Sequence, residues 1–141
     1  MNKEEYFRFY MNERCWKIYI KSQQEMKEYY NEDDIGYYYG QTHFMTQEIW
    51  ISDDVPKTQL DKTLFHELMH CYIRMYITTQ ELEYNEESLC DISANAYEII
   101  TSIITDFYQY KDKIQLIEEG KIMSNEELEK CIDKYRKNRV K

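Results

Sequence analysis

Apolar and polar positions along the first third of the chain follow a pattern that predicts strands. Residues 15–21 combine β-branched and aromatic side chains with partial alternation, which is typical of a strand. Residues 36–44 and 47–52 indicate two further strands around a tight turn. Residues 2–12 mix aromatic and charged positions, which fits a short helix or a first strand, and we favour the helix.

The next part of the chain shows helical periodicity. Ser22 and Glu25 form a capping box at the start of a short helix over residues 22–30. Pro56 suits the first turn of a second helix, which we expect to end near Thr78. At about 100° per residue, one face of that second helix is apolar. The residues of this stripe are Leu60, Leu64, Leu68, Cys71, Tyr72 and Met75.

A third helix is expected from Asn85, a good N-cap, to about Tyr108. Residues 111–119 indicate a separate short helix, and residues 124–136 a last one. One face of the third helix is again apolar and consists of Leu89, Ile92, Ala96, Ile99, Ile100, Ile103 and Phe107.

These elements predict an α+β fold in one domain that covers all 141 residues. A small antiparallel or mixed sheet of about three strands would pack on the central helix. A mostly helical C-terminal half would follow. No repeat, low-complexity tract or linker divides the chain.

The central helix carries the candidate chemistry, because His66, Glu67 and His70 form the motif H-E-x-x-H. Positions i and i+4 lie about 40° apart around a helix, so both imidazoles can bind one tetrahedral Zn²⁺. Glu67 between them is placed to take a proton from a water molecule at the metal. The motif therefore predicts a zinc-dependent peptidase. A helix with two histidines that meet by chance is the alternative.

A catalytic zinc site needs a third protein ligand. Glu87 and Asp91 share one face of the third helix, so Glu87 can bind the metal while Asp91 orients a ligating histidine. Glu86 is the second choice for the ligand, and a thiolate of Cys90 the third. Acidic residues in a first helical turn are also favoured by the helix dipole alone, which is the structural alternative.

The motif, a second helix and the pattern E-x-x-x-D together resemble the gluzincin branch of zinc peptidases. Residues 37–96 more closely resemble the short ImmA/IrrE-like metallopeptidases of phages and mobile elements. This resemblance implies that a strand at the sheet edge holds an extended peptide. It also implies an oxyanion-stabilising residue, and a transcriptional repressor as substrate or as a partner that is bound without cleavage.

Two further groups of residues have a structural and a functional interpretation. The run Tyr37-Tyr38-Tyr39 could line the cleft, but we favour an ordinary place in the surface and core of the sheet. His43, the only histidine outside the motif, is expected to be structural. The four cysteines contain no C-x-x-C pair and are expected to be reduced.

Charge and composition limit the partners. With 18 basic and 27 acidic residues the formal charge is −9, which disfavours nucleic-acid binding. Neither a signal peptide nor an apolar stretch long enough to cross a membrane is expected, so we predict a cytoplasmic protein without a membrane partner. A non-catalytic regulatory or helical interaction module is the alternative class, and the oligomeric state is left open.

Overall fold

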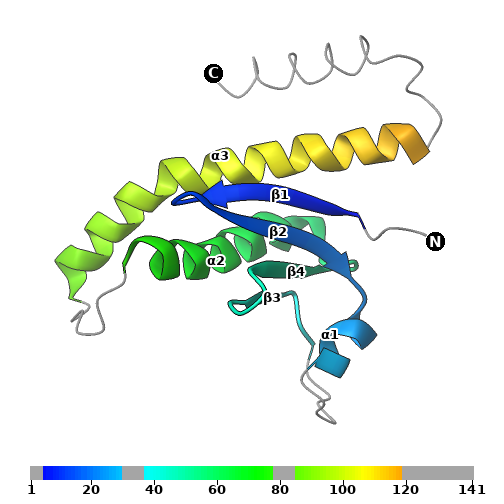
Figure 1. Cartoon of the computed structure of the whole chain (residues 1–141), viewed down its shortest axis with the longest axis horizontal. Helices are drawn as coiled ribbons and strands as arrows, with labels where there is room; N and C mark the ends of the chain where they lie inside the picture. Colours follow the sequence, from blue (N-terminus) through cyan, green and yellow to red (C-terminus); the bar gives the residue numbers. More distant parts are fainter. Residues whose placement is uncertain (1–4, 30–36, 78–84, 119–141) are drawn as a thin grey trace. The chain divides into compact units, whose positions relative to one another are not determined.

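The computed structural model describes residues 5–29, 37–77 and 85–118 and shows an α+β fold (Figure 1). The sheet has four strands, one more than expected, and the C-terminal half is mostly helical, as predicted. In chain order the elements are β1 (Tyr6–Met11), β2 (Arg14–Lys21), α1 (Gln23–Tyr29), β3 (Gly40–His43), β4 (Glu48–Ser52), α2 (Lys57–Tyr76) and α3 (Glu86–Glu118).

The sheet is mixed, and its strand order is β1-β2-β4-β3. The outer pairs β1–β2 and β3–β4 are antiparallel, whereas β2 and β4 run parallel. The parallel pair is possible because the crossover between β2 and β4 contains α1. β3 therefore forms one edge of the described sheet, beside α2 in space (Figure 1).

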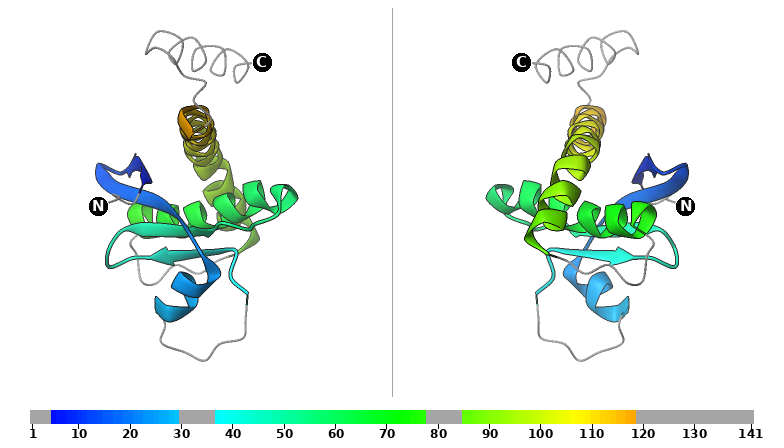
Figure 2. Two further views of the ribbon diagram at one scale, coloured as in Figure 1. Left: turned by 90° about the vertical axis from the view of Figure 1, so that its right-hand side faces the viewer. Right: turned by 90° about the vertical axis from the view of Figure 1, so that its left-hand side faces the viewer.

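The two faces of the sheet are covered by different helices (Figure 2). Gly40 pairs with Ile51 and Thr42 with Ile49, so these four residues share the face that packs against α2. Gln41 points the other way, toward α1, because its side-chain amide donates a 3.1 Å hydrogen bond to a backbone carbonyl of that helix. Alternation along β3 thus directs Gly40 and Thr42 toward α2 and Gln41 toward α1.

The expectation of a helix over residues 2–12 is wrong, because residues 6–11 form β1. Asn12 and Glu13 both have positive φ, 48° and 64°, and make the two-residue turn that joins β1 to β2. Asn12 is also anchored to the end of α2. Its backbone N–H donates to the Tyr76 hydroxyl at 2.8 Å and its side-chain amide to the Met75 carbonyl at 2.9 Å.

The first two helices follow the sequence pattern. Ser22 and Glu25 exchange the two 3.2 Å hydrogen bonds of the predicted capping box. All six residues of the apolar stripe predicted for the second helix are buried on α2, with Leu64, Leu68 and Cys71 fully enclosed. None of the helices in the described ranges is both long enough and apolar enough to span a membrane.

α3 departs from the expectation of two helices with a boundary near residues 108–111. It continues to Glu118, since no glycine or proline interrupts this stretch. Ala96, Ile100 and Phe107 are buried as expected, but Leu89 in its first turns is 49 % exposed. The predicted helix over residues 124–136 lies outside the described residues. The chain divides into two compact units, residues 1–100 and 101–141, and the candidate site belongs to the first.

Candidate functional site

The predicted motif lies in the middle of α2, where the histidines and the glutamate occupy different environments. His66 and His70 are exposed, and their ring centroids lie 5.0 Å apart with the planes at 78°. Glu67 is only 6 % exposed. One turn of helix therefore presents two imidazoles to solvent beside a buried carboxylate, which is the part of the site predicted from the i, i+4 spacing.

The edge strand β3 holds Glu67. The Thr42 hydroxyl donates a 2.9 Å hydrogen bond to Oε2 of Glu67 and lies 3.4 Å from the backbone carbonyl of the same residue. Gly40 lies so close that a Cβ there would stand 2.9 Å from Cγ of Glu67 and 3.1 Å from Cγ2 of Thr63. Strand and helix thus meet at the proposed catalytic carboxylate.

Two pockets adjoin His66. One, of about 370 Å³, is bounded by α2 and by the segment that leads into β3; its lining includes Tyr37, Tyr38, Tyr39, Gly40, His66 and Glu67. The tyrosine run therefore lines a cleft, whereas the sequence analysis had favoured a position in the surface and core of the sheet. The other pocket, of about 450 Å³, is lined by Phe65, Met69 and Ile73 with both histidines. Lys62 borders both pockets.

A hydrogen-bond network positions the tyrosine segment. The Tyr37 hydroxyl donates to the Asp54 carboxylate, and the Ser52 hydroxyl donates to the same carboxylate. These bonds lower the pKa of Asp54, and the bond to Asp54 raises the pKa of Tyr37, because each favours the ionised acid and the neutral phenol. Gln23 of α1 extends the network with a 2.8 Å bond from its side-chain amide to the Ser52 hydroxyl.

The turn between β3 and β4 contributes an aromatic side chain beside the second histidine. The Phe44 and His70 rings meet edge to face with centroids 6.4 Å apart. The Arg74 guanidinium lies 4.2 Å from the centroid of the Phe44 ring, in cation–π contact. Phe44 thus limits the space available to the His70 side chain.

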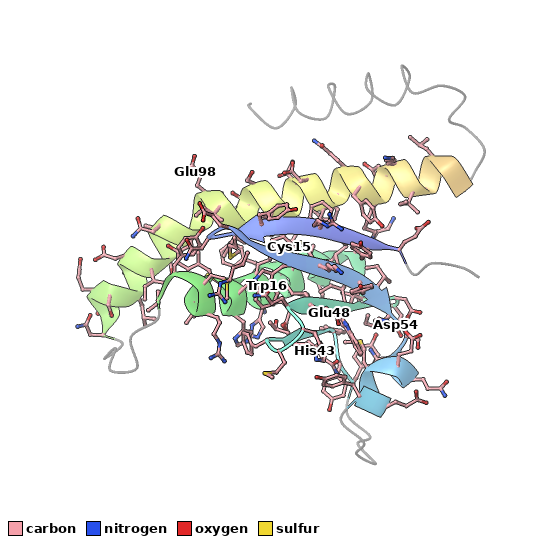
Figure 3. All side chains as sticks on the ribbon, in the orientation of Figure 1. Cys15, Trp16, His43, Glu48, Asp54 and Glu98 are labelled. Atoms are coloured by element: carbon pink, nitrogen blue, oxygen red, sulfur yellow. The ribbon has the colours of Figure 1, made fainter. Side chains whose placement is uncertain are left out.

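His43 is buried inside the sheet, which agrees with the structural interpretation of this histidine. It is 4 % exposed, pairs with Glu48 across β3 and β4 (Figure 3), and packs against Tyr29 and Trp50 on the sheet face opposite Thr42. Burial lowers its pKa, so the neutral imidazole is favoured.

The predicted third ligand and its partner lie at the start of α3. Asn85 caps this helix, accepting a 2.8 Å hydrogen bond from the Ser88 backbone N–H. Glu87 and Asp91 follow on the helix, and both are exposed. Within the described ranges, no three His, Cys, Asp or Glu side chains are grouped so that they could hold a metal ion. The structure brings His66 and His70 together and does not group Glu87 with them.

The cysteines in the described part of the chain are free. Cys71 is buried on α2, and burial together with the nearby Glu67 carboxylate raises the pKa of its thiol. Cys90, the third choice for the metal ligand, is exposed on α3.

Comparison with known proteins adds no family assignment: no family model matches the chain, and neither a curated protein nor a solved structure is significantly similar to it. The candidate site therefore rests on its own geometry. The α2 donors fit zinc in part, since two neighbouring imidazoles supply two of the three protein ligands of a catalytic site. The sequence analysis did not identify four residues that the structure places at this site, namely Gly40, Thr42, Phe44 and Lys62.

Proposed function

We propose that this protein is a zinc-dependent peptidase in which His66 and His70 hold the ion and Glu67 is the general base. The observation that carries the proposal is the pair of exposed imidazoles on one turn of α2, beside a carboxylate fixed by β3. Glu87 is the proposed third ligand, and Asp91 the partner of a ligating histidine. A cytoplasmic location belongs to the proposal and suits the free cysteines of the described ranges.

Each residue then has a defined task. Zinc, when bound, supplies Lewis-acid chemistry: it lowers the pKa of water and polarises a peptide carbonyl. Glu67 accepts the proton of the attacking water and delivers it to the leaving nitrogen. His66 and His70 must be neutral to bind the metal, and an Asp91 carboxylate that accepts a ring N–H would fix the required tautomer.

The proposed substrate is an extended segment of another protein. β3 is at the edge of the sheet that the described residues form, so its outer side can pair with a peptide main chain, and the pockets beside His66 can receive side chains. The resemblance to peptidases of mobile elements makes a transcriptional repressor the first candidate. No nucleic acid or membrane is proposed as a partner.

One observation favours a second candidate, a regulatory protein that binds such a partner without cleaving it. Glu87 is not grouped with the two histidines among the described residues. A chain that lacked the third ligand would keep the edge strand and both pockets but would not hold zinc firmly enough for catalysis.

Metal analysis separates the two candidates. The purified protein is expected to contain one zinc per chain. It is also expected to cleave a repressor that is encoded next to it, in a reaction that a chelator stops. His70→Gln should lose the zinc, whereas His43→Gln, the same change on the other face of the sheet, should keep it. A folded wild type without zinc, or binding of the repressor without cleavage, would favour the regulatory candidate.

A further inference from the structure

Two residues of β3 face Glu67 from successive positions on the same side of the strand. Gly40 and Thr42 are two apart, so both point toward α2, and each approaches the Glu67 side chain directly. The glycine approaches its Cγ and the threonine its Oε2. Between them they contact both the stem and the head of the side chain.

Thr42 limits the orientation of the carboxylate. A buried carboxylate that loses water needs hydrogen-bond donors, and the Thr42 hydroxyl supplies one at 2.9 Å. This bond engages one oxygen, Oε2, while Glu67 still lines the pocket that contains His66. The carboxylate is therefore held through one oxygen, and the residue borders the pocket.

Gly40 makes the approach possible. A Cβ at this position would lie 2.9 Å from Cγ and 3.3 Å from Cδ of Glu67, and the first distance is shorter than real side chains tolerate. Thr63, at 3.1 Å, blocks displacement of the new methyl group toward the preceding turn of the helix. Any larger residue must therefore push Glu67 or separate the strand from α2.

We infer that Gly40 and Thr42 are positioning residues that fix the Glu67 carboxylate in its working orientation. The inference rests on the proposed function, because it assigns a purpose to the contact only if Glu67 is the general base. Substrate pairing on β3 would extend the same strand that orients the base. Peptide binding and placement of the base would then use the same strand.

Kinetics of Thr42→Val test the inference. This variant keeps the shape of the side chain and removes the donor, so kcat should fall about 10- to 100-fold, the value of one hydrogen bond to a charged group. KM and zinc content should not change. Thr42→Ser restores the hydroxyl and should recover most of kcat, and Gly40→Ala should lower kcat in the same way.

Thr105→Val is the matched control, because the Thr105 hydroxyl donates to the Thr101 carbonyl of the same helix, α3. It should have wild-type kinetics. Unchanged kcat in Thr42→Val, or a Thr42→Ser variant as slow as Thr42→Val, would overturn the inference while leaving the peptidase intact.

A stability cycle tests the contact even if the protein hydrolyses nothing. In zinc-free protein, unfolding is measured for Thr42→Val, Glu67→Met and the double variant. If the two side chains interact, the double variant should change the unfolding equilibrium constant about tenfold less than the two single variants combined. Additive effects would overturn the positioning role, whereas a coupled pair in a protein without zinc or turnover would show that the contact exists but that the proposed function is wrong.

Discussion

The two helices that carry the proposed site hold their functional side chains in different ways. On α2, Glu67 is buried, bonded to Thr42 and packed against Gly40. At the start of α3, Glu87 and Asp91 are exposed and follow an ordinary N-cap. The proposed general base is thus built into the contact between sheet and helix, whereas the proposed third ligand is exposed on α3.

The largest effect is expected at Glu67. Glu67→Gln keeps the size of the side chain and an acceptor for Thr42 but cannot take a proton, so hydrolysis should fall by about 10²- to 10⁴-fold. Zinc content should remain at the wild-type value, because the residue is not a proposed ligand. Parallel assays of turnover and bound metal check this prediction, and unimpaired turnover would remove the general-base assignment.

A smaller effect, on zinc affinity, tests the proposed roles of Glu87 and Asp91 on α3. Glu87→Gln should weaken zinc affinity by more than the roughly 10- to 100-fold loss expected for Asp91→Asn, because a ligand contributes more than its hydrogen-bonded partner. Glu86→Gln, one position earlier on the same exposed turn, is the matched control and should bind zinc normally. Competition titration with a chromophoric chelator measures all three. If Glu86→Gln weakens binding and Glu87→Gln does not, the ligand is the neighbouring residue.

The smallest effect concerns Cys71 and Cys90, the cysteines on the described helices, and requires no mutation. A raised pKa leaves less thiolate at neutral pH, so the buried Cys71 should resist iodoacetamide in the native protein. Cys90 is exposed and should be alkylated first. Peptide mass spectrometry after a short exposure distinguishes them. Equal labelling would show that α2 is not enclosed as described.

The sequence predicted the fold well where periodicity was strong. The buried stripe of α2 and the capping box of α1 followed from residue spacing alone. β1 was missed because Asn12 and Glu13 form its turn with positive φ, and neither is the glycine that marks such turns. The length of α3 was missed because a weak change in pattern was interpreted as a boundary.

The site was predictable only within one helix. His66, Glu67 and His70 follow from local spacing, whereas Thr42 lies 25 residues before Glu67 and meets it only through the sheet. The alternation of a glycine and a threonine in the segment that forms β3 was the available signal. The tyrosine run was ambiguous, since aromatic residues suit a sheet surface and a cleft equally well.

A crystal structure of the zinc-loaded protein, with anomalous diffraction at the zinc edge, is the most direct measurement. The account predicts one ion about 2.0–2.1 Å from a nitrogen of His66 and of His70, with a carboxylate oxygen of Glu87 at a similar distance. An ion bound elsewhere, or held by the two histidines without any residue from α3, would contradict it.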